Sequence, residues 1–166
     1  VSSPRFRVYT SSGVVGVELG GALKNVIALG AGVADGLRMG HNAKAAFITR
    51  GLAELARVGV AAGANPLTFG GLSGLGDLIA TCESPLSRNR TFGQLLSEGL
   101  TVDAARDRIG HVVEGAITAY AMVELGRRYG VETPIADAVV AVLDGRVSVA
   151  DAMHLLLTRD RRAELD

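Results

Sequence analysis

The apolar segment between residues 19 and 34 constrains the fold of this chain more than any other feature. It reads LGGALKNVIALGAGVA, and it contains one charged residue, Lys24, which is followed by Asn25. Lysine is seldom buried without a partner, because removing water from its ammonium group is costly. Lys24 is therefore a candidate proton donor. The alternative interpretation places it on the wet side of an amphipathic helix, with its head in solvent.

The spacing of the apolar residues predicts an all-α bundle. After the opening residues no segment alternates with a period of two, and no repeat with a fixed period is visible. A first helix carries the apolar segment, and Pro66 begins a short one. Further helices are predicted to begin at Asn42 and to cover 76–82, 87–96, 101–109, 117–128, 134–143 and 148–157. Gly130 and Gly145 are the expected helix stops.

Three local features add detail to this prediction. Phe6, Val8 and Tyr9 predict a short strand, so residues 1–13 are assigned to a strand and linker and residues 14–166 to the helical domain. In the helix that Asn42 caps, an apolar stripe contains Ile48, Leu52, Leu55 and Gly59, and a polar stripe contains Arg50, Glu54 and Arg57. Residues 70–76 read GGLSGLG and predict a flexible hinge that leads to Asp77.

Two groups of polar residues form the candidate site together with Lys24. Asp77 and Thr81 are four residues apart and share a face if residues 76–82 are helical. Residues 87–90 read Ser-Arg-Asn-Arg at a predicted helix start, where arginine side chains and free N–H groups suit a phosphate. The alternative is an exposed basic helix start without a ligand. Together the two groups could hold a small phosphorylated, hydroxylated substrate.

Composition excludes several other classes of protein. Seventeen basic and seventeen acidic residues leave no net charge, so nucleic acid and anionic membranes are not expected partners. No apolar run reaches the roughly 20 residues of a membrane span. The single cysteine, Cys82, predicts a buried inert thiol and fits a reducing compartment. His41, His111 and His154 are far apart, so no metal site is predicted.

A dinucleotide-binding turn over residues 25–35 is disfavoured. The sequence NVIALGAGVAD resembles a strand that enters such a turn. Asp35, however, stands where the fingerprint needs glycine or alanine, and no strand with a terminal acid follows at the right interval. Close approach of a helix to its neighbours better explains the glycines at 16, 20, 21, 30, 32 and 36.

Four motifs, taken in order, resemble the C-terminal half of bacterial NAD(P)-dependent glycerol-3-phosphate dehydrogenases. They are GVELGGALKN at 16–25, NAKAA at 42–46 followed by ITRGLAE at 48–54, GLGDL at 74–78 and SPLSRNR at 84–90. The resemblance runs essentially from end to end. It implies a helical fold like the C-terminal domain of 6-phosphogluconate dehydrogenase, with the strand near Tyr9 left from an N-terminal Rossmann domain.

The resemblance also implies roles for individual residues. Lys24 matches the catalytic proton donor and acceptor of the family. The other positions that match substrate contacts are Asn25, Asp77, Thr81, Ser87, Arg88 and Asn89. Arg88, Val112 and Glu114 match positions that contact the nicotinamide cofactor in the family. The cofactor is NAD(P)H, bound mainly by the N-terminal domain, and the substrate is glycerol 3-phosphate or dihydroxyacetone phosphate.

The family further implies a cytoplasmic homodimer that feeds glycerophospholipid synthesis. Because hydride transfer needs the Rossmann domain, this chain alone is expected to be inactive. Two alternatives remain open at this point: the helical domain of another β-hydroxyacid or 6-phosphogluconate-type dehydrogenase, and a helical binding module without enzymatic activity.

Overall fold

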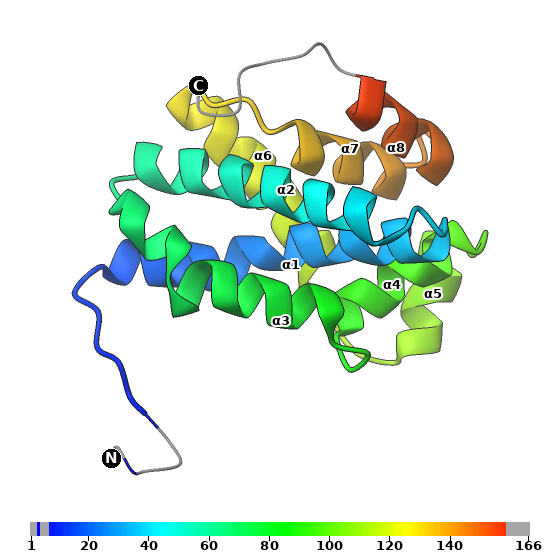
Figure 1. Cartoon of the computed structure of the whole chain (residues 1–166). Helices are drawn as coiled ribbons and strands as arrows, with labels where there is room; N and C mark the ends of the chain where they lie inside the picture. The colour runs from blue at the N-terminus through cyan, green and yellow to red at the C-terminus, as the bar shows by residue number, and fades with distance from the viewer. Residues whose placement is uncertain (1–2, 4–6, 159–166) are drawn as a thin grey trace.

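The computed structural model describes residue 3 and residues 7–158, and its regular structure is helical throughout this part of the chain (Figure 1). The elements are α1 (Val14–Gly36), α2 (His41–Ala61), the 3-10 helix η1 (Pro66–Gly70), the π-helical turn η2 (Leu72–Gly76), α3 (Asp77–Glu83), α4 (Arg88–Ser97), α5 (Val102–Ile109), α6 (Glu114–Tyr129), α7 (Pro134–Leu143) and α8 (Val149–Thr158). The all-α prediction is confirmed. Residues 159–166, which the domain assignment included, lie outside the described residues.

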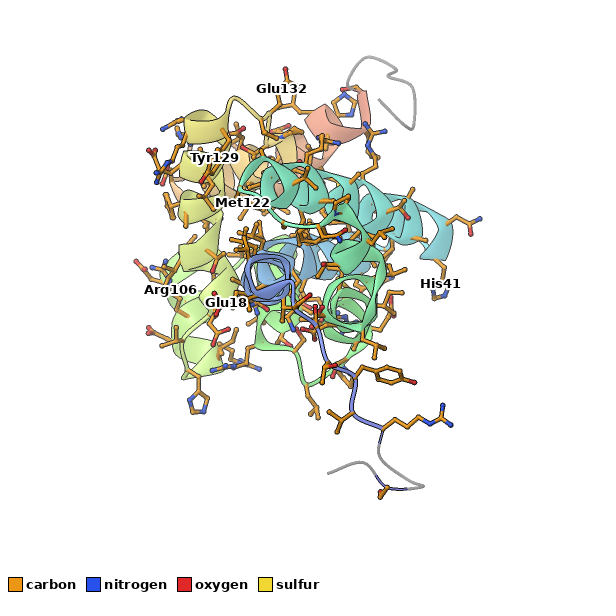
Figure 2. The ribbon with its side chains drawn as sticks, turned by 90° about the vertical axis from the view of Figure 1, so that its left-hand side faces the viewer. Glu18, His41, Arg106, Met122, Tyr129 and Glu132 are labelled. Carbon is orange, nitrogen blue, oxygen red and sulfur yellow. The ribbon has the colours of Figure 1, made fainter. Side chains whose placement is uncertain are left out.

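Helix α1 forms the centre of the bundle. It packs against α2, α3, α4, α6 and α7, and Figure 2 shows it nearly end-on with the other helices around it. Every residue from Asn25 to Ala34 is buried. A helix that is apolar on all sides must be surrounded in this way. The fold therefore explains why this segment is almost free of charge.

Helix α1 also has the length and composition of a membrane-spanning helix. It has 23 residues, and 56% of its most apolar 18-residue window is buried inside the bundle. Core helices of water-soluble proteins meet the same criteria. A membrane span is therefore not indicated by this helix.

Close backbone contact joins α1 to α4. A Cβ atom on Gly32 of α1 would lie 1.9 Å from the carbonyl oxygen of Arg90, and a Cβ atom on Gly93 of α4 would lie 2.0 Å from that of Leu29. Neither position has room for a side chain. The glycines thus let the two helix backbones touch, as the sequence predicts for the glycines of the apolar segment.

Most predicted helix ends are confirmed by their capping contacts. The Ser87 hydroxyl accepts a hydrogen bond from the Arg90 N–H, and the Thr101 hydroxyl accepts one from the Ala104 N–H. Pro134 occupies the first turn of α7. Gly130 ends α6 with a φ of +67°, a left-handed conformation that favours glycine.

Two predictions about local structure are wrong. Helix α2 begins at His41 after Gly40, whose φ is +84°, so Asn42 lies inside the first turn and is not the cap. The glycine-rich segment before Asp77 is not a loose hinge, because Leu72–Gly76 forms a π-helical turn that continues into α3. Gly74 lies so close to Phe69 that a Cβ atom would be 2.2 Å from the Phe69 carbonyl oxygen. These glycines allow close packing.

The predicted strand is also not observed. Val8 and Tyr9 have no regular secondary structure, and Phe6 lies outside the described residues. Both side chains are exposed, and no segment within residues 7–158 is a strand.

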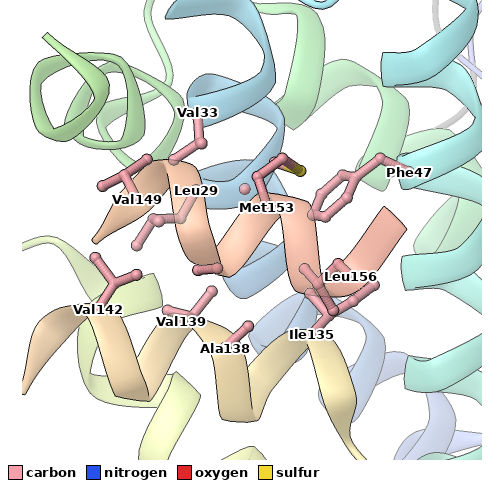
Figure 3. A pocket seen from close by; sticks show the side chains of 12 residues that line it. Leu29, Val33, Phe47, Ile135, Ala138, Val139, Val142, Val149, Met153 and Leu156 are labelled. Atoms are coloured by element: carbon pink, nitrogen blue, oxygen red, sulfur yellow. The ribbon is translucent and has the colours of Figure 1, made fainter. Parts of the chain in front are cut away.

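A small apolar cavity lies where α8 covers α1, α2 and α7. Its volume is about 30 Å³, and Figure 3 shows Met153 and Phe47 among the side chains that line it. Ligand pockets are usually roughly 300–1,000 Å³ and carry a few polar groups. This cavity is therefore an imperfection of core packing, and the candidate site has to be sought elsewhere.

Candidate active site

The ammonium group of Lys24 is held by Asp77. The Lys24 side chain on α1 is only 16% exposed and forms an ion pair with the carboxylate of Asp77, the first residue of α3. Thr81, one turn further along α3, donates its hydroxyl to the Asp77 carbonyl oxygen at 2.7 Å and lies 3.5 Å from the carboxylate. The interpretation of Lys24 as an ordinary surface lysine is therefore wrong.

Glu114 connects the residue beside Lys24 to an arginine. The Asn25 amide donates to one Glu114 carboxylate oxygen at 3.1 Å. The other oxygen lies 3.6 Å from a guanidinium nitrogen of Arg88. Asn25 is buried, whereas Arg88 and Glu114 are about half exposed. Asn25 of α1 and Arg88 of α4 thus both contact the carboxylate of Glu114 on α6, and all three are predicted site residues.

Asn89 fixes the start of α6 against the same group. Its buried side-chain oxygen accepts a hydrogen bond from the Gly115 N–H at 2.8 Å. A Cβ atom on Gly115 would lie 2.4 Å from the Asn25 carbonyl oxygen, so only glycine allows this approach. Sequence reasoning missed Gly115. Its one signal was its position directly after Glu114.

The remaining predicted residues have less central positions. Ser87 acts as the N-cap of α4 through its bond to the Arg90 N–H. Val112 precedes α6 and has a side chain that is 60% exposed. Arg90, the last residue of the predicted phosphate cluster, contributes nothing to the site directly, because its guanidinium group pairs with Asp35. An anion would therefore meet Arg88 rather than two neighbouring arginines.

The cluster has a balanced set of charges. Lys24 and Arg88 supply two cations, and Asp77 and Glu114 supply two carboxylates. The carboxylates orient the cations in the absence of a ligand, and a bound phosphate would compete with Glu114 for Arg88. Asn25, which follows Lys24, is joined through Glu114 to the half-exposed Arg88. In such an arrangement an ammonium group can stabilise a developing oxyanion while a guanidinium group holds the phosphate of the same molecule.

Cys82 lies at the end of α3 and is completely buried. Burial raises the pKa of its thiol to about 12. The prediction of a buried cysteine is confirmed, and the raised pKa disfavours the reactive thiolate.

Glu54 is the residue whose environment the sequence pattern misrepresents most. The apolar spacing predicts Glu54 on the polar stripe of α2, but the residue is 1% exposed. Its two carboxylate oxygens accept hydrogen bonds from the N–H groups of Ile135 and Ala136 at 2.9 and 3.0 Å. Glu54 thus caps the start of α7 from a different helix, which spacing along α2 could not reveal.

We expect Glu54 to make the stability of the fold depend on pH. Burial raises the pKa of this carboxyl from its ordinary 4.5 to about 7. Because the folded state binds the proton more tightly, the stabilisation is fully present below pH 4.5 and is lost as the pH rises through 7. The expected loss is about 3 kcal/mol. Urea unfolding at pH 4.5 and 7.5 measures it.

The matched variant for this measurement is Glu54→Gln, which cannot titrate. Its free energy of unfolding should change less than that of the unaltered protein over the same pH range. Identical pH profiles for the two proteins would show that Glu54 does not titrate in this interval.

Several known proteins are similar in sequence to this chain. The family model for the NAD-dependent glycerol-3-phosphate dehydrogenase C-terminus matches residues 13–154. A glycerol-3-phosphate dehydrogenase [NAD(P)+] of Acidovorax sp. (strain JS42) is 53% identical over 97% of this chain and 49% of its own length. The corresponding protein of Thermobifida fusca is 53% identical over 98% of this chain and 48% of its own length.

Solved structures of glycerol-3-phosphate dehydrogenases are also similar to this chain. A crystal structure of glycerol-3-phosphate dehydrogenase from Coxiella burnetii superposes with a TM-score of 0.91 and 40% identity, covering 95% of this chain and 49% of that one. The yeast enzyme matches with a TM-score of 0.82 and 29% identity, over 93% of this chain and 46% of that one.

These matches define the class of the molecule as the helical C-terminal domain of a dehydrogenase. The chain belongs to the NAD-dependent glycerol-3-phosphate dehydrogenase C-terminus family. It spans about half the length of the curated relatives it matches.

Proposed function

We propose that this chain supplies the substrate-binding and proton-transfer residues of a glycerol-3-phosphate dehydrogenase. The enzyme would interconvert dihydroxyacetone phosphate and sn-glycerol 3-phosphate with NAD(P)H. The observation that carries the proposal is the largely buried Lys24 side chain, whose ammonium group is paired with Asp77. Residues 14–166 would form the substrate domain, and residues 1–13 the connection to the nucleotide-binding domain that makes up the other half of the relatives.

Lys24 is proposed as the proton donor. Reduction of a ketone places negative charge on its oxygen, and an ammonium group next to that oxygen both stabilises the charge and delivers the proton. Asp77 orients the ammonium group through the ion pair. In the reverse direction the same nitrogen accepts the proton of the substrate hydroxyl. Thr81 and Asn25 are proposed to hold substrate oxygens on either side of it.

Arg88 is proposed to hold the substrate phosphate. Its guanidinium group is half exposed and lies at the start of α4, whose free N–H groups add partial positive charge. Asn89 and Ser87 occupy the same turn. Holding the phosphate here fixes the reacting carbon relative to Lys24. This raises the rate of the chemical step, because the bound substrate is already oriented for reaction.

Arg88, Val112 and Glu114 also fit an approaching nicotinamide cofactor. All three are about half exposed or more, and Glu114 already holds Arg88 and Asn25. A cofactor bound mainly by another domain could therefore reach them from outside. When bound, a nicotinamide cofactor would supply the hydride.

The wider setting follows from the same proposal. We propose a cytoplasmic homodimer whose product, glycerol 3-phosphate, enters glycerophospholipid synthesis. The buried, reduced Cys82 agrees with a reducing compartment. This chain without a nucleotide-binding domain is expected to be inactive, and turnover by the isolated chain would contradict that expectation.

The test of the proposed function is turnover by the full-length protein. We expect oxidation of NADH or NADPH with dihydroxyacetone phosphate. In the reverse direction, reduction of NAD+ or NADP+ should be far slower with 6-phosphogluconate-type or β-hydroxyacid substrates than with glycerol 3-phosphate. The opposite preference would favour the second dehydrogenase class. Absence of turnover with every substrate of these classes would favour a binding module without enzymatic activity.

We expect Arg88→Ala to weaken binding of glycerol 3-phosphate about 100-fold, because it removes a charge-assisted contact to the phosphate. Calorimetric titration of the full-length protein measures the Kd. The control is Arg50→Ala, which removes an exposed arginine of α2 outside the cluster. Equal affinity of the Arg88 and Arg50 variants would remove Arg88 from the phosphate site.

A further inference from the structure

A second group of charged residues lies beyond the candidate site, at the far end of α1. Two nitrogens of Arg90 lie 2.7 Å from the same carboxylate oxygen of Asp35. Lys44 lies 3.0 Å from that oxygen and 3.0 Å from a carboxylate oxygen of Glu83. We call these four residues the Asp35 network. It connects α1, α2, α3 and α4 through side chains that, apart from Glu83, are at most 21% exposed.

The carboxylate at the centre of the Asp35 network is too distant from Lys24 to take part in proton transfer. Asp35 lies eleven residues after Lys24 on the same helix, which is about 16 Å along its axis. The charges of the network also neutralise one another, because the cations Arg90 and Lys44 pair with the carboxylates of Asp35 and Glu83. The network can therefore influence the reaction only by fixing the positions of the helices that carry the candidate site.

Three of the four connected helices carry the candidate site. Arg90 follows Asn89 directly in the first turn of α4, and Glu83 ends α3 two residues after Thr81. Helix α1 carries Lys24. The network thus joins the three helices on which the proposed substrate contacts lie, and Lys44 of α2 anchors it from outside.

The backbone contact between α1 and α4 makes this connection stiff. The carbonyl oxygen of Arg90 itself lies against Gly32, so the residue that makes the ion pair also makes a close backbone contact with α1. A carboxylate contacted by two guanidinium nitrogens also restricts the rotation of α4 about its own axis. Rotation of α4 would carry Arg88 and Asn89 away from Glu114 and Gly115.

We propose that Arg90 is a positioning residue: its contact with Asp35 fixes α4 on α1 so that Arg88 and Asn89 face the substrate. This inference rests on the proposed function. It assigns to Arg90 an effect on substrate binding without any contact with the substrate. Asp35 and Lys44 act in the same way, through Arg90.

The test is a double-mutant cycle in the full-length protein between Arg90→Met and Arg88→Ala. We expect Arg90→Met alone to reduce kcat/KM for glycerol 3-phosphate about 10- to 100-fold, as misplacement of a substrate contact does. In the Arg88→Ala background, Arg90→Met should also reduce kcat/KM, but by a factor at least about threefold smaller. The effect is smaller because the group that Arg90 positions has already been removed. Equal factors in both backgrounds would overturn the proposal.

The effect of Arg90→Met on the stability of the fold must be distinguished from its effect on the position of α4. Glu54→Gln is the control, because it disturbs a buried contact between α2 and α7 and leaves α4 untouched. Its kcat/KM should stay near that of the unaltered protein. If Arg90→Met fails to fold, Arg90→Lys replaces it, and an unchanged KM for that folded variant would overturn the proposal. Absence of glycerol 3-phosphate turnover in the unaltered protein would instead overturn the proposed function.

Discussion

Replacing Lys24 by methionine in the full-length protein is expected to reduce kcat by about 1,000-fold or more, because one group both donates the proton and stabilises the oxyanion. Methionine keeps much of the volume of the lysine stem, so the packing of α1 should be retained. Asp77 is 41% exposed, so its carboxylate can be hydrated when its partner is removed. The fold should therefore tolerate the change, and the loss should be chemical.

Steady-state kinetics with saturating substrate measure this effect, together with the melting temperature of the variant. Asp77→Asn serves as the intermediate case, since it retains the ammonium group but removes the charge that orients it. Arg50→Met is the control for the loss of a positive charge on an exposed surface. If the Lys24 variant retained kcat within tenfold of the unaltered enzyme, another group would have to be the proton donor.

The second large effect is expected from Gly32→Ala. The added methyl group would lie 1.9 Å from the Arg90 carbonyl oxygen, and that atom belongs to the backbone, so α4 must move as a whole. We expect a loss of about 3 kcal/mol or more in the free energy of unfolding, at the upper end of overpacking effects. Because α4 carries Arg88 and Asn89, kcat/KM should fall as well.

Gly21→Ala in the same helix is the matched control. A Cβ atom on Gly21 would have no neighbour within 4 Å, so the change should increase stability by about 0.5–1 kcal/mol through helix propensity. Chemical unfolding of both variants gives the comparison. Equal effects of the two substitutions would mean that α1 and α4 do not touch through Gly32.

Several local features of the fold could be predicted from the sequence because they depend on residues a few positions apart. Ser87 and Thr101 cap helices by bonding to an N–H three residues later. Pro134 and Gly130 set backbone angles by their own covalent structure. Such rules failed at the start of α2, where Gly40 with its positive φ precedes the helix, and in the predicted strand.

The candidate site was identified from motifs, and its connections came from the tertiary structure. Spacing placed Asp77 and Thr81 on one face, as observed. It gave no reason to pair Glu114 with both Asn25 and Arg88, or to direct Arg90 away toward Asp35. Arg88 and Arg90 are both arginines in one helix turn, and only their different directions on the helix distinguish their roles.

By itself the sequence determined that this protein is an all-helical bundle, that its first helix carries the apolar segment, and that Lys24 is the residue to explain. These properties depend on the pattern of apolar side chains and on local backbone preferences. The tertiary structure alone decided which charges meet: Lys24 with Asp77, Arg90 with Asp35, and the Glu54 carboxylate with the start of α7. The physical reason is that a buried charge is stabilised by whichever partner packing brings within about 3 Å, and packing joins residues far apart in the chain.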